Sequence, residues 1–125
     1  MSKKRYISLQ KIRQKAFDLQ SGKCYYCNQP MWNKDKLSFI SQYKIKPTLA
    51  NLLQCTAEHL TARQDGGKNT KVNIVAACKY CNHTRHKAKK ALSPESYKQR
   101  VQKRLSKKEW HGIIINQATY LRTPS

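Results

Sequence analysis

Four cysteines arranged in two pairs carry the clearest chemical signal in the chain. The pairs are Cys24-x-x-Cys27 and Cys78-x-x-Cys81. Zn²⁺ prefers four tetrahedral sulfur or nitrogen ligands, and a two-residue gap lets both members of a pair reach one ion from a single turn. Because the protein fills all four positions, such a site is closed. We therefore expect a structural zinc ion rather than a catalytic one.

A long insertion separates the two cysteine pairs. It spans residues 28–77, fifty residues, whereas zinc ribbons usually leave about 15 to 20 between their pairs. A folded segment must therefore lie between the two halves of the zinc site. The insertion holds a fifth cysteine, Cys55, which we expect to be a small buried side chain, because free cysteine commonly behaves as a hydrophobe.

The charge of the chain is strongly one-sided. Its 125 residues include 26 Lys and Arg against 6 Asp and Glu, a formal net charge of +20. Such a field concentrates polyanions, so nucleic acid is the expected partner. The length allows one domain with a modest core. The sequence has no run of 18 apolar residues and no apolar segment after its basic N-terminus, so we expect no membrane association and a cytoplasmic location, where thiols stay reduced.

The elements that must position these residues follow from hydrophobic spacing. Helical spacing predicts a first helix over residues 8–20 and a last one over 94–110, where Ser93 is the N-cap and Pro94 the first helical residue. Between them, the pattern favours a strand within 37–46, a helix or strand over 48–54, a strand leading to His59, a Gly-Gly loop at Gly66-Gly67, and a helix from Val72 to about Ala91. The apolar start of the C-terminal tail, 113–125, favours a strand or an extended arm.

The motifs between and beside the cysteine pairs stand in a distinctive order. They read "CYYC", "EHL", "DGG", "NIVAAC" and "CKYCN". In this order they resemble the HNH (ββα-metal) endonuclease family in its four-cysteine form, over residues 22 to about 90. The resemblance implies an α+β fold, namely a small ββα-metal core stapled by the four-cysteine zinc site, and the helical spacing outside it adds basic helical flanks. Together these observations divide the chain into an N-terminal basic helix (1–21), a nuclease domain (22–91) and a C-terminal basic helix and tail (92–125).

The resemblance also implies a role for each residue of a second site. His59 is the implied general base that activates water, and Asn73 orients its imidazole or holds the loop. Glu58 and Asn82, joined by His86 one helical turn later, are the implied ligands of a catalytic Mg²⁺ or Mn²⁺ ion. Neighbouring strand residues point to opposite faces, so Glu58 and His59 share a cleft only at a strand end or a bulge.

Two positions depart from the usual family pattern. Glu58 stands where Asp is commoner, and Asn82 replaces the final His, which gives an HNN variant. Asn is a weak ligand for Zn²⁺ or Ni²⁺ and a fair one for Mg²⁺, so the metal preference should move toward Mg²⁺.

Basic side chains around these motifs are the expected contacts to phosphate. They are Arg63, Lys68, Arg85, Lys87, Lys89 and Lys90. The expected substrate is DNA, in the first place double-stranded, and RNA is the alternative.

Two other functions compete with a nuclease. A non-catalytic zinc module that binds nucleic acid by its charge would explain the cysteines and the net charge, but not the order of Glu58, His59, Asn73 and Asn82. A zinc nucleobase deaminase needs His-x-Glu and Pro-Cys-x-x-Cys. Here Glu58 precedes His59 and no proline precedes Cys78, so we set the deaminase aside.

Overall fold

The computed structural model describes residues 8–111 and contains five α-helices, two strands and one short 3₁₀ helix. The elements run in the order α1 (Leu9–Leu19), α2 (Lys36–Tyr43), α3 (Pro47–Leu52), β1 (Cys55–His59), η1 (Arg63–Asp65), β2 (Ile74–Cys78), α4 (Lys79–Lys87) and α5 (Pro94–Ser106). No helix within the described range is long and apolar enough to span a membrane.

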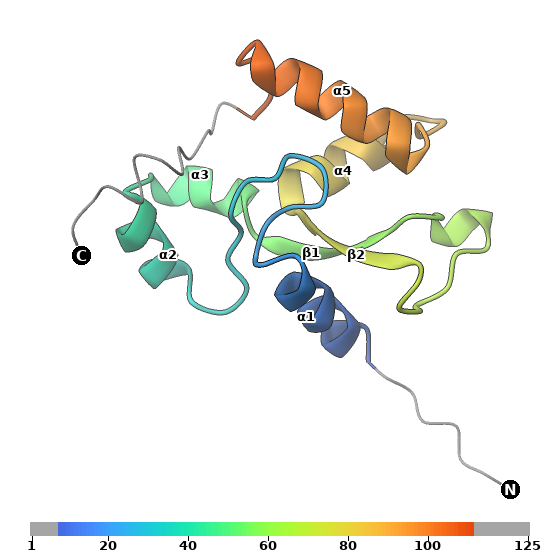
Figure 1. Ribbon diagram of the computed structural model, residues 1–125, viewed down its shortest axis with the longest axis horizontal. Helices are drawn as coiled ribbons and strands as arrows, with labels where there is room; N and C mark the ends of the chain where they lie inside the picture. The colour runs from blue at the N-terminus through green and yellow to red at the C-terminus, as the bar shows by residue number, and fades with distance from the viewer. Residues whose placement is uncertain (1–7, 112–125) are drawn as a thin grey trace, which may run out of the picture.

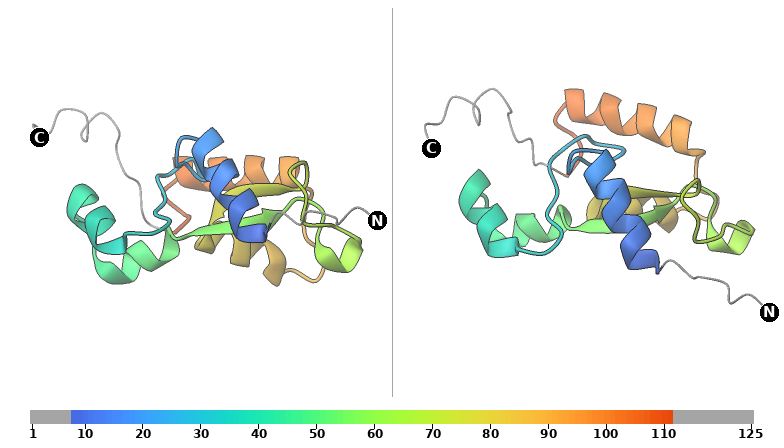
Figure 2. Two further views of the ribbon diagram at one scale, coloured as in Figure 1. Left: turned by 90° about the horizontal axis from the view of Figure 1, so that it is seen from below. Right: turned by 60° about the horizontal axis from the view of Figure 1, so that its bottom comes forward.

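The centre of the fold is an antiparallel hairpin followed at once by a helix. Strand β1 pairs with β2 in a register that places Cys55 opposite Cys78 and His59 opposite Ile74. Helix α4 begins at the residue after β2 and packs against one face of the two strands, while α1 covers the opposite face (Figures 1 and 2). The α+β fold with a ββα core that the sequence predicted is confirmed.

Helix α1 covers the sheet with its apolar side and also protects an open strand edge. Ser8 caps the helix by accepting from the backbone N–H of Lys11 at 3.2 Å, and Ile12 is buried against the sheet. Just after the helix, the Gln20 side-chain amide donates to the carbonyl of Ala76 at 2.8 Å and accepts from its N–H at 2.9 Å. The amide therefore pairs with the outer edge of β2 as a neighbouring strand would.

The strand predicted within residues 37–46 is wrong, because helix α2 occupies that segment. Its β-forming residues include Phe39 and Tyr43, which are one helical turn apart. The centroids of their rings lie 4.8 Å from each other. Asp35 caps the helix by accepting from the N–H of Ser38 at 3.0 Å. The next segment, which the sequence left open, is helix α3 with Pro47 in its first turn.

The helix predicted from Val72 to Ala91 is also wrong over its first part. Residues Ile74–Cys78 form β2, and α4 covers only Lys79–Lys87. A short apolar run does not reveal by its periodicity whether it is a buried strand or a buried helix. Here the pairing with β1 decides, because it buries Ile74, Ala76, Ala77 and Cys78 in the hairpin.

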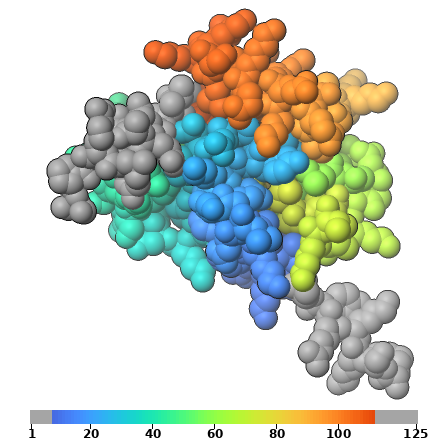
Figure 3. All heavy atoms as spheres, in the orientation of Figure 1, coloured from blue at the N-terminus to red at the C-terminus, as the bar shows by residue number. Residues whose placement is uncertain are grey.

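Helix α5 is part of the same core as the hairpin. It begins as predicted, with Ser93 as N-cap and Pro94 in its first turn, and ends at Ser106, short of the predicted residue 110. Tyr97 and Val101 are buried beneath it, and α5 lies on the segment that carries the first cysteine pair (Figure 3). The C-terminal tail, for which a strand or an arm was predicted, lies outside the described residues.

Shortening Val101 should therefore loosen α5 and destabilise the whole domain. Val101 is fully buried, so Val101→Ala removes two methyl groups from a packed site and should lower the free energy of unfolding by about 2 kcal/mol. Urea denaturation of the zinc-loaded protein measures the change. Lys103→Ala, on the exposed side of the same helix, is the control and should change stability by less than about 0.5 kcal/mol. Equal stability of both variants would show that α5 is not part of the cooperative unit.

Candidate active site and metal centre

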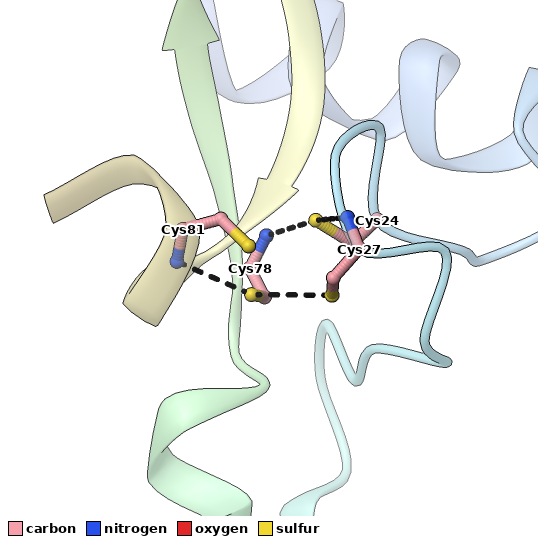
Figure 4. Close-up of side chains that lie close together, drawn as sticks. All are labelled: Cys24, Cys27, Cys78 and Cys81. Atoms are coloured by element: carbon pink, nitrogen blue, oxygen red, sulfur yellow. Dashed lines mark hydrogen bonds between the residues drawn. The ribbon is translucent and has the colours of Figure 1, made fainter. Parts of the chain in front are cut away.

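The four predicted cysteines meet at one buried point. Their sulfur atoms all lie within 4.8 Å of one another, and those of Cys27 and Cys78 are 3.9 Å apart. Tetrahedral Zn²⁺ with bonds of about 2.3 Å places neighbouring sulfurs about 3.8 Å apart, so the cluster is compatible with one zinc ion. Cys24 and Cys27 come from the loop after α1, whereas Cys78 ends β2 and Cys81 lies on α4 (Figure 4).

Hydrogen bonds to sulfur prepare this cluster to bind a cation. Backbone N–H groups of Tyr26 and Cys78 donate to the sulfur of Cys24 at 3.4 and 3.3 Å. Although burial raises it, hydrogen bonds from Cys27 and from the other cluster thiols hold the pKa of Cys24 well below its ordinary value. The indole N–H of Trp110 donates to the sulfur of Cys81 at 3.3 Å. The pKa values of two other thiols are raised: that of Cys78 by its hydrogen bond to Cys24, and that of Cys81 by burial. The cluster therefore favours a thiolate at Cys24, and a bound cation would supply the charge that holds the other sulfurs as thiolates, the form that binds zinc.

Cys55 stands apart from the zinc cluster, as the sequence predicted for a buried spare thiol. It is buried at the start of β1, and burial raises the pKa of its thiol to about 12. Among residues 8–111, the four clustered cysteines form the only group of three or more His, Cys, Asp and Glu side chains close enough to hold one ion. A second ion would therefore need an amide or water among its ligands.

A polar cleft of about 370 Å³ lies between the end of β1 and helix α4. It brings together four of the residues predicted for the second site, and its lining comprises Glu58, His59, Ala62, Arg63, Gln64, Asn82 and His86. Strand β1 ends at His59. The sequence required a strand end or a bulge for Glu58 and His59 to reach the same cleft, and the strand end meets that requirement.

Glu58 divides its two carboxylate oxygens between the core and the cleft. The residue is 1% exposed. Its Oε2 accepts from the hydroxyl of Tyr26 at 2.7 Å and from the guanidinium of Arg85 at 2.8 Å. Burial and the Glu58 charge raise the pKa of Tyr26, which keeps the phenol a donor. Oε2 therefore anchors the side chain, and Oε1 is the oxygen that a metal would use.

The two other residues predicted as ligands of the second metal, Asn82 and His86, line the same cleft. Nε2 of His86 lies 2.8 Å from Oε1 of Glu58. Two ligands at right angles on an ion with bonds of about 2.1 Å are separated by about 3 Å, so the pair fits one edge of a Mg²⁺ or Mn²⁺ coordination shell. Asn82 donates its side-chain N–H to the hydroxyl of Thr56 at 3.0 Å. That contact leaves its oxygen as the atom suited to a hard cation.

His59 and Asn73 lie at the two ends of the loop between β1 and β2, but the hydrogen bonds of their side chains go to other residues. The imidazole Nε2 of His59 lies 2.7 Å from Oδ1 of Asn69. The Asn73 side chain accepts from the N–H of Thr61 and donates to the carbonyls of Thr61 and Lys68. Of the two roles considered for Asn73, its contacts match holding the loop, while Asn69 is the residue beside the imidazole.

The Gly-Gly turn makes this loop possible. Gly66 has φ of +91°, a conformation that side chains rarely adopt. A Cβ on Gly67 would lie 1.7 Å from the carbonyl oxygen of Thr61, so that position requires the absence of a side chain. The glycines and Asn73 thus fold the segment after His59 back over the cleft.

Arg85 is not placed as the phosphate contact that the sequence suggested. The residue is 5% exposed. Besides Glu58, its guanidinium donates to the backbone carbonyls of His59, Leu60 and Leu92 at 3.1 to 3.2 Å. Its hydrogen-bonding capacity is spent inside the protein. The other basic candidates, Arg63, Lys68, Lys87, Lys89 and Lys90, are exposed, and among these Arg63 lines the cleft.

Replacing Arg85 should therefore damage the fold rather than phosphate binding. Arg85→Met would leave a buried carboxylate without its charged partner, which costs about 3–5 kcal/mol. Thermal unfolding followed by circular dichroism measures the loss. Arg100→Met removes an exposed arginine on α5 and should be nearly neutral. A stable Arg85→Met protein with weakened DNA binding would restore the phosphate role.

The sequence motifs and this geometry agree with a family comparison. Residues 41–88 match the family model described as HNH endonuclease. The matched segment contains β1, the loop, β2 and α4, which together hold every residue lining the cleft. Residues 41–88 are therefore similar to an HNH endonuclease domain, which agrees with the resemblance seen in the motifs. No curated protein matches the chain.

Proposed function

We propose that the protein is a metal-dependent endonuclease that hydrolyses phosphodiester bonds in DNA, with residues 22–91 as its nuclease domain. The observation that supports this most strongly is the meeting of Glu58, His59, Asn82 and His86 in one polar cleft beside a separate zinc cluster. A zinc module that binds nucleic acid by charge alone needs none of these four residues there.

Each residue of the cleft has one task in the proposed reaction. His59 accepts a proton from water, and the resulting hydroxide forms a bond to phosphorus while the bond to the leaving sugar oxygen breaks. Glu58, Asn82 and His86 would hold the divalent cation. When bound, that cation polarises the phosphate and stabilises the negative charge on the leaving oxygen. Arg63, at the mouth of the cleft, binds a phosphate of the substrate strand.

The zinc cluster positions both halves of the cleft. Cys78 and Cys81 fix the junction between β2 and α4, and α4 carries Asn82 immediately after Cys81. The first cysteine pair adds Tyr26, which binds Glu58. The structural ion therefore sets the distance between the ligand on β1 and the ligands on α4.

Incubation of zinc-loaded protein with supercoiled plasmid tests the proposed activity. Nicked or linear DNA should form with Mg²⁺ or Mn²⁺, and none should form with EDTA. A labelled RNA duplex in the same reaction tests the choice of substrate. Intact plasmid under every metal condition, together with tight DNA binding, would favour the non-catalytic zinc module.

His86 provides a sharper test of the proposed metal site. His86→Ala should lower the cleavage rate by at least about 10-fold and raise the Mn²⁺ concentration needed for half-maximal rate, because one ligand is lost. Titration of the rate with Mn²⁺ measures both effects. The control is His83→Ala, an exposed histidine on the same helix that does not line the cleft. Equal metal dependence of both variants would remove His86 from the metal site.

A further inference from the structure

The imidazole of His59 faces two partners with opposite requirements. Its Nε2 lies 2.7 Å from the side-chain oxygen of Asn69, which accepts a hydrogen bond, and 3.3 Å from Nε of Arg63, which donates one. In a neutral imidazole, one nitrogen carries the proton and the other carries the lone pair. Nε2 therefore cannot donate to Asn69 and accept from Arg63 at the same time.

These two contacts correspond to two tautomers with different chemical capacity. With the proton on Nε2 and donated to Asn69, Nδ1 carries the lone pair. With the proton on Nδ1, Nε2 accepts from Arg63 and its lone pair is occupied. The contact to Asn69, at 2.7 Å, has the usual length of a good hydrogen bond, whereas the contact to Arg63, at 3.3 Å, is longer. The Nε2–H tautomer is therefore the favoured one.

We propose that Asn69 is a positioning residue that holds His59 in the Nε2–H tautomer, so that Nδ1 is the atom that takes the proton from water. This inference rests on the proposed function, in which His59 is the general base. Arg63 is the competing donor, and a substrate phosphate that binds Arg63 removes the competition. The cleft then holds the base in its active form when substrate is present.

The loop supplies the rigidity that this task needs. Asn69 follows Lys68, whose carbonyl accepts from the Asn73 side chain at 3.0 Å and from the N–H of Thr70 at 3.0 Å. Gly67, the residue before Lys68, lies against the backbone carbonyl of Thr61. Asn73 therefore acts on His59 indirectly, because it fixes the backbone beside Asn69.

Nitrogen NMR of the zinc-loaded 125-residue chain labelled with ¹⁵N-histidine reports the tautomer without any need for activity. The His59 signals are identified by their loss in His59→Ala. The wild type should show Nε2 protonated and Nδ1 unprotonated at a pH where the ring is neutral. Asn69→Ala should shift the ring toward the Nδ1–H form. An unchanged tautomer in Asn69→Ala would overturn the inference, even if the protein cleaves no DNA.

Cleavage kinetics add a readout that a purely structural role would not produce. Asn69→Ala should lower the single-turnover rate about 10-fold or more while the Kd for a short DNA duplex stays within about 2-fold. Asn69→Asp keeps an acceptor oxygen and should retain most of the rate. Thr70→Ala is the control in the same loop. A specific role for the acceptor oxygen would be contradicted if Asn69→Asp cleaved as slowly as Asn69→Ala. It would also be contradicted if Thr70→Ala cleaved as slowly as Asn69→Ala. If the wild type cleaves nothing, the proposed function fails and the NMR result alone decides this inference.

Discussion

His59→Ala should nearly abolish DNA cleavage. The single-turnover rate should fall by about 10²- to 10⁴-fold, because a positioned general base contributes that much. The side chain sits at the end of β1, where it lines the cleft and contacts the exposed residues Asn69 and Arg63. Its removal should therefore leave the fold and the affinity for a DNA duplex nearly unchanged. Quenched-flow or gel-based cleavage with Mn²⁺, and fluorescence anisotropy of a labelled duplex, measure the two quantities.

The controls for His59→Ala separate a chemical role from a structural one. His83→Ala changes another histidine of the same chain and should retain the wild-type rate. Thermal unfolding of His59→Ala should coincide with that of the wild type. A His59→Ala protein that is unfolded would make His59 a structural residue, and one that cleaves at the wild-type rate would place the base elsewhere.

Cys81→Ser should unfold much of the domain, and this is the largest stability change that we expect from one substitution. Binding of structural zinc contributes about 10–16 kcal/mol in small zinc domains, which is comparable to or larger than the total stability of a typical fold. The zinc cluster also anchors α4 and α5, since the carbonyl of Cys81 accepts from Tyr97 at 2.7 Å and its sulfur accepts from Trp110. Zinc content by mass spectrometry and far-ultraviolet circular dichroism measure the result.

Cys55→Ser is the matched control for the zinc site. It changes another buried cysteine by the same single atom, but Cys55 lies outside the cluster. Cys55→Ser should keep one zinc ion per chain and lose at most about 1–3 kcal/mol from the new buried hydroxyl. Equal zinc content and equal melting of Cys81→Ser and wild type would show that the cluster binds no structural zinc.

The parts of the molecule that the sequence predicts well are those in which chemistry restricts the spacing. The two-residue gap within each cysteine pair predicted that the four thiols would meet, because this spacing is typical of zinc ligands. The order of the motifs predicted that Glu58, His59 and Asn82 would share one site, and these three residues line the same cleft. Helix α5 was predicted at its start, because Ser93 and Pro94 are strong local signals.

The parts that were missed depend on tertiary contacts. Strand β2 was assigned to a helix because its apolar run has no distinctive period, and the pairing with β1 determines its conformation. Arg85 looks in the sequence like any other basic residue of a highly basic segment, and only the fold places it against Glu58. Asn69 carries no signal of its own, because the Gly-Gly loop is what brings it to His59.

The zinc ion should be needed for the fold and the second divalent cation for cleavage, so removing the second cation alone separates the two roles. Zinc-loaded protein is dialysed against a weak chelator that removes Mg²⁺ and Mn²⁺ but not tightly bound zinc. Plasmid cleavage and zinc content are then followed while Mn²⁺ is restored. We expect one zinc ion per chain throughout, no cleavage after dialysis, and full cleavage when Mn²⁺ returns. Cleavage that persists with zinc alone, or no cleavage with Mn²⁺ present and zinc retained, would show that the two metals do not have these separate roles.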